Sequence, residues 1–197
     1  MTTYPNWFAC YADEFFARHL THLAGKPGLR FLQIGAFTGD ASLWLVENVL
    51  THETSQLTDV DTWAGSDEPE HEPIDFADVE RVYRARVEPF RLELTIQPLK
   101  MTSQGFFSGQ VLFDTAFDFI YIDGDHTAPT VLSDAVHAFE VLKPGGLLAF
   151  DDYQWKPYTD APAHLAPGMA IDCFTACYQD RLEILEAGLQ VWVRKTA

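Results

Sequence analysis

Acidic side chains and a histidine gather in two short segments, each directly after an apolar run. The side chains concerned are Asp123, Asp125, His126, Asp151 and Asp152. Clustered carboxylates raise one another's pKa unless a cation neutralises them. Two or three carboxylate oxygens are typical ligands of Mg²⁺ or a similar divalent ion. This pattern predicts a metal site, although Asp125 could instead cap a following helix.

Two glycines follow an earlier apolar run at 29–34. Gly35 and Gly39 let the backbone turn sharply and approach a ligand, and the next helix offers its free N–H groups. Their Gly-x-x-x-Gly spacing differs from the dinucleotide fingerprint, which disfavours a nicotinamide or flavin oxidoreductase. After a second run, Asp61 could hold a ribose diol or simply cap a turn.

The elements that must position these residues alternate along the chain. Apolar runs predict strands at 29–34, 56–60, 92–96, 117–122 and 147–150, followed by a hairpin of 182–185 and 189–193. Helical spacing predicts helices at 7–23, 38–50, 129–142 and 170–178, with a turn at 143–146. Short apolar strands between helices predict an α/β fold with a mainly parallel, doubly wound sheet. Ligands of such sheets bind at the carboxyl ends of the strands.

We interpret residues 1–197 as one domain, in which 1–28 form an N-terminal helical segment. Residues 66–91 form an acidic insertion with a helix over 75–87, which either lies on the surface or covers the pocket as a lid. The aromatic-rich first helix packs in the core by default, but could line an acceptor pocket or a dimer interface. Four residues after the fifth strand are candidate walls of the acceptor pocket: Tyr153, Trp155, Tyr158 and His164.

The charge balance narrows the partners. Thirteen Lys and Arg against 29 Asp and Glu give a net charge of −16. This charge repels phosphate backbones and anionic lipid, so we expect neither a nucleic-acid nor a membrane partner. Three cysteines cannot build a disulfide framework, and we expect Cys173 and Cys177 to be buried as small apolar residues. Without a signal peptide or a long apolar run, the protein is expected in the cytoplasm.

The motifs, taken in order, resemble class I S-adenosylmethionine-dependent methyltransferases. Within that class the chain is most similar to the small-molecule O-methyltransferase-like group, of methyltransferase family 24 type. The resemblance runs from about residue 29 to 194 and rests on segments 31–39, 60–66, 122–126, 142–146 and 151–153. It implies a Rossmann-like sheet of seven strands in the order 3-2-1-4-5-7-6, with strand 7 antiparallel and helices on both faces.

The resemblance also implies where S-adenosyl-L-methionine binds. Gly35 and Gly39 would pass under its methionine part, and Asp61 would hold the ribose hydroxyls. Residues 102–103 and 124–126 would lie near the adenine. The cofactor-binding residues implied in this way are Gln33, Gly35, Phe37, Gly39, Asp61, Thr62, Thr102, Ser103, Asp123, Gly124 and Asp125.

For the chemistry, the resemblance implies a divalent cation, Mg²⁺ or another, held by Asp123, Asp151 and Asp152. His126 stands where the catechol branch has a general-base lysine, and a histidine, with an unperturbed pKa of about 6.5, can take that role. Gln33 departs from the family pattern, because an acidic residue usually anchors the cofactor's amino-acid end there and glutamine carries no charge.

The leading hypothesis is therefore metal-assisted methyl transfer to a hydroxyl of a small-molecule acceptor. One alternative is a metal-independent methyltransferase that acts on nitrogen or another atom. A second alternative, motivated by Gln33, is a non-catalytic S-adenosylmethionine-binding protein. A homodimer is compatible with all three.

Overall fold

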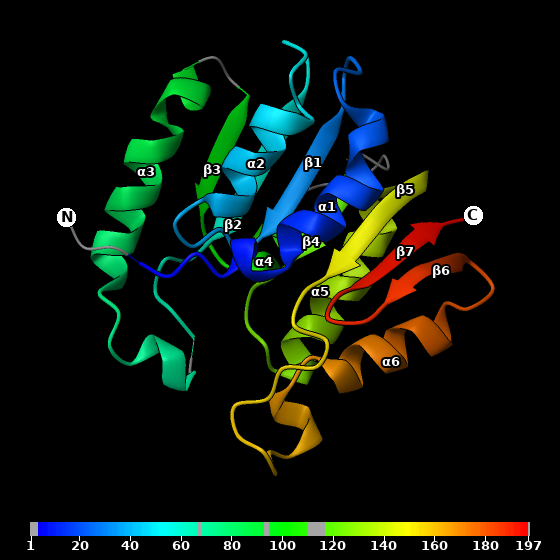
Figure 1. The fold of residues 1–197 in the computed structure, drawn as a ribbon. Coiled ribbons are helices and arrows are strands. Elements are labelled where there is room, and N and C mark those ends of the chain that lie inside the picture. Colours follow the sequence, from blue (N-terminus) through cyan, green and yellow to red (C-terminus); the bar gives the residue numbers. More distant parts are fainter. Residues whose placement is uncertain (1–3, 67, 93–94, 110–116, 197) are drawn as a thin grey trace.

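The computed structural model describes residues 4–66, 68–92, 95–109 and 117–196. Seven strands form one sheet in the order β3-β2-β1-β4-β5-β7-β6 (Figure 1). The first five pair in parallel, and β7 runs antiparallel to both β5 and β6. The predicted Rossmann-like order with an antiparallel seventh strand is confirmed. The strand bounds are β1 (Arg30–Ile34), β2 (Gln56–Asp61), β3 (Ile96–Lys100), β4 (Phe117–Ile122), β5 (Leu142–Phe150), β6 (Leu182–Ala187) and β7 (Val191–Lys195).

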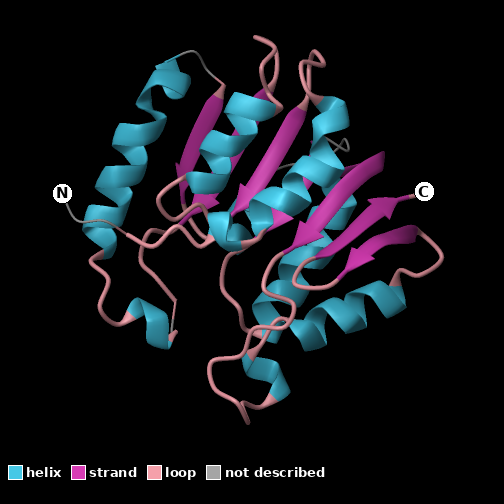
Figure 2. Cartoon of the chain, in the orientation of Figure 1, coloured by secondary structure: helices cyan, strands magenta, loops and turns pink. Residues whose placement is uncertain are grey.

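Helices cover both faces of the sheet (Figure 2). Their bounds are α1 (Ala12–Leu20), α2 (Asp40–Asn48), α3 (Phe76–Leu92), α4 (Ser103–Gly109), α5 (Ala128–Val141) and α6 (Gly168–Cys177). One buried cluster joins α1, α2 and α3 to the sheet through side chains such as Phe16, Leu45 and Tyr83. A second joins α4, α5 and α6 to it through Phe106, Phe139 and Phe174. Two apolar layers thus fix the sheet and the directions in which its strands end.

The third strand does not lie where the sequence predicts it. The prediction at 92–96 overlaps the end of α3 at Leu92, whereas β3 starts at Ile96; residues 93–94 lie outside the described ones. The sequence signals are weak here, because two prolines lie inside regular elements: α3 continues through Pro89, and β3 contains Pro98. Since β3 is an edge strand, one missing backbone donor is tolerated there.

Two further elements differ in extent from the prediction. The predicted turn at 143–146 belongs to β5, whose pairing with β4 shifts register between Phe117 and Phe119, and Gly145 adopts a φ of 81° in this bulge. The predicted helix at 7–23 is broken into the 3-10 helix η1 (Phe8–Cys10), α1 and the 3-10 helix η2 (Thr21–Leu23).

The cysteine prediction is wrong. Cys173 and Cys177 are exposed on α6. That helix buries Ala170, Ile171 and Phe174, so the two cysteines lie on its outward face. Within the described ranges, no helix has both the length and the apolar character that crossing a membrane requires.

Candidate functional site

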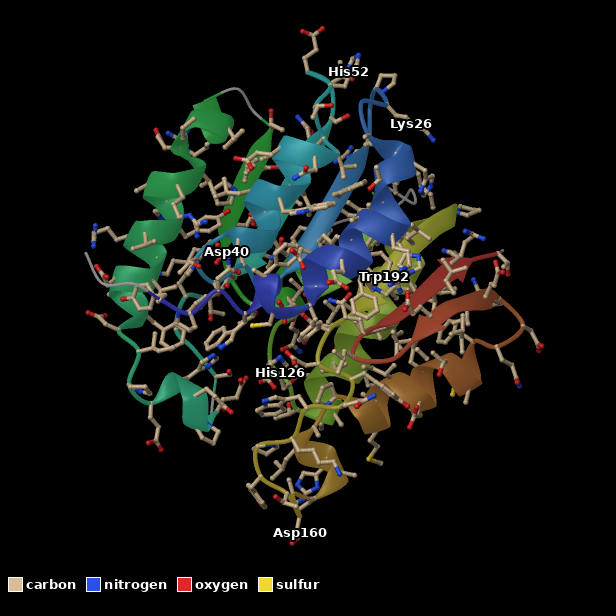
Figure 3. All side chains as sticks on the ribbon, in the orientation of Figure 1. Lys26, Asp40, His52, His126, Asp160 and Trp192 are labelled. Carbon is tan, nitrogen blue, oxygen red and sulfur yellow. The ribbon has the colours of Figure 1, made fainter. Side chains whose placement is uncertain are left out.

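A cavity of about 630 Å³ opens at the carboxyl ends of the parallel strands. Figure 3 shows His126 beyond the arrowheads of the strands, at the opposite end of the sheet from His52 and Lys26. All sequence-predicted site residues except Gly39 line the cavity: Gln33, Gly35, Phe37, Asp61, Thr62, Thr102, Ser103, Asp123, Gly124, Asp125, His126, Asp151 and Asp152.

The loop between β1 and α2 approaches the end of β4 very closely. Gly35 has a φ of 85°, and a Cβ there would lie 1.8 Å from the backbone oxygen of Asp123. Only glycine fits this contact, which brings the first and fourth strand ends together. Gly39, with a φ of 84°, caps α2 and faces Tyr83 of α3, whose Cδ2 atom would lie 3.0 Å from a Cβ at position 39. Gly39 therefore lets the β1–α2 loop pack against Tyr83 and does not itself line the cavity.

Asp61 ties the two loops beside the cavity together. Its Oδ2 accepts hydrogen bonds from the backbone N–H groups of Ala36 (2.7 Å) and Phe37 (3.0 Å). Its Oδ1 accepts one from the N–H of Trp63 at 2.7 Å. Phe37 and Trp63 both have a φ of 46°, and the Trp63 indole donates a hydrogen bond to the Phe37 carbonyl at 3.0 Å. The carboxylate thus stabilises two strained loop residues at once.

Gln33 is almost completely buried, with 1% exposure. Its Nε2 donates a hydrogen bond to the Gly35 carbonyl at 2.7 Å, and its Oε1 accepts one from the Ser42 hydroxyl at 3.4 Å. A carboxylate could not make the first of these bonds, because it has no donor. On the neighbouring strand Asp59 pairs in register with Gln33. A buried acidic group therefore does lie beside this position, although on β2.

Three potential metal ligands lie close together at the ends of β4 and β5. Asp123, His126 and Asp152 each offer a ligand atom, and these atoms lie within 4.8 Å of one another. His126 Nε2 is 3.2 Å from Asp152 Oδ2 and 3.9 Å from Asp123 Oδ1, and its Nδ1 is 3.2 Å from Glu68 Oε2. None of these contacts has the geometry of a hydrogen bond. Both ring nitrogens of His126 are therefore buried without a hydrogen-bond partner.

The charges of this group shift the pKa values of its members. Burial lowers the pKa of His126, but the carboxylates of Asp123, Asp152 and Glu68 outweigh it and raise that pKa well above its ordinary value. Burial and the charge of Asp151 raise the pKa of Asp123. An imidazolium ring has no free lone pair, so His126 can accept a proton or bind a metal only after it loses its own proton.

Asp151 is held differently from the other predicted metal ligands. Its Oδ1 accepts hydrogen bonds from the Tyr11 hydroxyl (2.8 Å), the Asp152 N–H (2.8 Å) and Gln190 Nε2 (3.1 Å), and its Oδ2 accepts one from Tyr121. The side chain is buried, at 8% exposure. Asp151 therefore lies outside the group of Asp123, His126 and Asp152. The sequence prediction names Asp151, and not His126, as the third metal ligand.

Two segments that follow no strand directly also line the cavity. Trp7 and Tyr11 come from the N-terminal segment, and Glu68 and His71 come from the acidic insertion. The Trp7 ring lies 4.7 Å from that of Phe37, centroid to centroid. Of the four candidate wall residues after β5, only Trp155 lines the cavity, with its ring 4.8 Å from that of His126. The cavity thus has an aromatic border at its acidic end.

Sequence reasoning missed several residues of the site. Glu68 and Asp134 line the cavity, and Tyr11 bonds to its carboxylates. Asp59 and Tyr83 stand behind it, joined by a hydrogen bond of 2.6 Å. For Glu68 there is a signal, because the acidic insertion is considered as a lid, but the sequence does not single out one of its residues. Asp59, Tyr83 and Asp134 lie within helices or a strand, where spacing carries no signal of proximity to the site. Tyr11 belongs to the aromatic-rich first segment, for which the sequence leaves open a place in the pocket wall.

The comparisons with known proteins agree with this arrangement. The family model Methyltransf_24, a methyltransferase domain, matches residues 32–153. The chain therefore belongs to this family, within the class I S-adenosylmethionine-dependent methyltransferases. No curated protein matches the chain significantly.

Solved structures share the fold across the whole chain. A candidate O-methyltransferase from Klebsiella pneumoniae has a TM-score of 0.67 at 16% identity, with 100% of this chain and 84% of that chain covered. A candidate rRNA methylase from Clostridium thermocellum gives 0.66 at 13%, covering 100% and 99%. The Bacillus cereus O-methyltransferase, solved with S-adenosylhomocysteine, gives 0.62 at 14%, covering 98% and 83%.

Proposed function

We propose that this methyltransferase moves the methyl group of S-adenosylmethionine to a hydroxyl of a small molecule, assisted by a divalent cation. The single observation that carries the proposal is the group of Asp123, His126 and Asp152, whose ligand atoms face one another at one end of the cavity. The net charge of −16 supports a small acceptor over a nucleic acid.

The cofactor would bind along the carboxyl ends of the strands. The loop of Gly35 and Phe37 would lie under the methionine part, and Asp61 with Thr62 would face the ribose. Thr102, Ser103, Gly124 and Asp125 would surround the adenine, and all of these residues line the cavity. Gln33 would act on the amino-acid end through the Gly35 turn that it holds.

For the metal, the donor set fits a divalent cation. Two carboxylates supply hard oxygen ligands, and a buried imidazole without a hydrogen-bond partner supplies nitrogen. Imidazole suits Mn²⁺ or Zn²⁺ better than Mg²⁺, although Asp123 and Asp152 alone could hold Mg²⁺. When bound, the cation would lower the pKa of a coordinated acceptor hydroxyl.

The chain's own residues would then position the acceptor. Trp155 and Trp7 would exclude water from the hydroxyl and the methyl group, and Glu68 would orient the imidazole through Nδ1. We assign Nε2 of His126 as a ligand because it faces both carboxylates. The general-base role of His126 stays a prediction from the sequence, and measurement of metal affinity separates the two roles.

One observation favours a second candidate, methyl transfer without a metal. The His126 ring already lies among three carboxylates, with two contacts at 3.2 Å, and its charge would balance theirs where a cation would otherwise be needed. Turnover that survives strict chelation would select this candidate.

The test combines calorimetry with activity. S-adenosylmethionine and S-adenosylhomocysteine are titrated with and without Mg²⁺ or Mn²⁺, and phenolic, catechol and sugar acceptors are then screened. Asp152→Asn should lose metal-dependent heat and turnover but retain cofactor binding, and Asp123→Asn should also lose metal-dependent heat and turnover. Asp160→Asn, an exposed aspartate in the loop after β5, is the matched control (Figure 3). Failure to bind either cofactor form would overturn the proposal.

A further inference from the structure

A carboxylate on α5, outside the group of Asp123, His126 and Asp152, is buried in the cavity wall. Asp134 is 2% exposed and lines the cavity together with Thr130, one helical turn earlier. A buried carboxylate is costly unless donors surround it. Lys and Arg are absent from the described residues that line this cavity, so no fixed cation balances the charge of Asp134.

The neighbours of Asp134 leave most of its accepting capacity free. Ser103, at the start of α4, neighbours the carboxylate, and the titratable groups close to it are His137 and Asp125. Burial raises the pKa of Asp134 to about 6, against the effects of Ser103 and His137. Two carboxylate oxygens accept about four hydrogen bonds, so one hydroxyl cannot satisfy them. Further donors must come from what the cavity binds.

The position of Asp134 identifies the part of the ligand that reaches it. Ser103 follows β3 and Asp125 follows β4, whereas Asp152 follows β5 on the other side of β4. Asp134 thus belongs to the β3–β4 side of the cavity, where the proposed cofactor places its adenine. Adenine carries an exocyclic amino group with two N–H donors and no acceptor at that atom.

We propose that Asp134 makes the site selective for adenine, by accepting a hydrogen bond from the exocyclic amino group while Ser103 holds the carboxylate in place. This inference rests on the proposed binding of S-adenosylmethionine. A base with a carbonyl at the same position would present an oxygen to the carboxylate, and two acceptors repel each other. Sites built to pair with a donor reject analogues that lack it.

The experiment compares S-adenosylhomocysteine with S-inosylhomocysteine, in which a carbonyl replaces the amino group. Calorimetric Kd values are measured at pH 8, where Asp134 is ionised and can only accept. The wild-type protein should bind the inosyl analogue at least about tenfold more weakly. Asp134→Asn should reduce this ratio to below about threefold, because an amide can rotate to offer either an acceptor or a donor.

Two further variants isolate the effect. Asp134→Ala should weaken S-adenosylhomocysteine binding and also remove the discrimination, whereas Asp160→Asn should leave both Kd values unchanged. A role confined to holding the fold would change both affinities equally and leave their ratio intact. Equal binding of the two ligands by the wild-type protein, or a full ratio in Asp134→Asn, would overturn the inference while cofactor binding stands. No binding of S-adenosylhomocysteine by the wild-type protein would instead refute the proposed function and, with it, this inference.

Discussion

Tyr83 of α3 donates a hydrogen bond of 2.6 Å to Asp59 of β2, and both side chains are completely buried. The Tyr83 ring also lies 4.7 Å from that of Trp63, centroid to centroid, and closes the space behind Gly39. The helix of the acidic insertion therefore packs against both loops, after β1 and after β2, that border the cavity. Its Arg86 extends this contact by donating hydrogen bonds to the Thr38 carbonyl and to Asp40.

Replacing Tyr83 by phenylalanine should destabilise the protein. The change removes the hydrogen bond that Asp59 Oδ2 accepts, and Asp59 Oδ1 already has no partner. Leaving a buried acceptor unsatisfied costs about 1–3 kcal/mol in the free energy of unfolding, measured by urea denaturation. Tyr158→Phe is the control, because Tyr158 is 56% exposed. Equal stability of the two variants would mean that the bond contributes nothing.

Asp59 should also make stability depend on pH. Burial raises its pKa from 3.8 to about 6, against the effects of the neighbouring Tyr83 and Ser42 hydroxyls. The folded state therefore holds the proton more tightly than the unfolded state, and stability falls as pH rises from about 4 to about 6. Two pKa units correspond to about 3 kcal/mol.

Asp59→Asn isolates this effect, because the amide oxygen still accepts from Tyr83 but does not titrate. Relative to the wild-type protein, the variant should gain stability by about 3 kcal/mol between pH 4 and pH 6.5. Other acidic groups titrate in both proteins and cancel in the difference. Unfolding free energies at five pH values would check it, and a difference that does not change with pH would contradict the assignment.

Gly35→Ala should be among the most damaging single substitutions. The new Cβ would meet the Asp123 carbonyl at 1.8 Å, in a residue whose φ is 85°. Two matched variants separate clash from strain in thermal unfolding. Gly28→Ala has a φ of 69° but nothing within 4 Å, and should cost about 1 kcal/mol. Gly188→Ala has open space and no positive φ, and should be nearly neutral. If Gly35→Ala behaves like Gly28→Ala, the close approach of the two loops is wrong.

The sequence predicts the central strands well for a physical reason. Strands β1 and β4 are short, largely apolar runs buried on both faces, and the chemistry-bearing residues follow them directly. Edge strand β3 is predicted too early, at 92–96, because few of its residues are buried and Pro98 argues against a strand.

Within the site, the sequence predicts only those residues that directly follow a strand. Asp123 and Asp152 could be brought together because neighbouring strands end at one edge. Tyr11 and Glu68 reach the same place from distant segments, and the inward face of Asp134 depends on the rotation of α5. Sequence reasoning treats Asp151 and Asp152 alike, because only tertiary contacts distinguish one carboxylate from the next.

Asp151 and Asp152 should therefore respond differently to the same substitution. Asp151 accepts four hydrogen bonds, from Tyr11, Tyr121, Gln190 and the Asp152 N–H. Asp151→Asn replaces one accepting oxygen by a donor in a buried network, and should cost about 1–3 kcal/mol of unfolding free energy. Asp152 is more accessible, with 24% of its side chain exposed, and Asp152→Asn should stay within about 0.5 kcal/mol of the wild-type protein.

Metal binding should show the reverse order. Asp152→Asn should weaken Mn²⁺ binding at least about tenfold in calorimetry, because it removes a proposed ligand charge. Asp151→Asn, measured below its unfolding temperature, should retain most of the affinity. If Asp151→Asn is stable and has lost the metal while Asp152→Asn binds it normally, the two carboxylates have exchanged the roles that their hydrogen bonds assign to them.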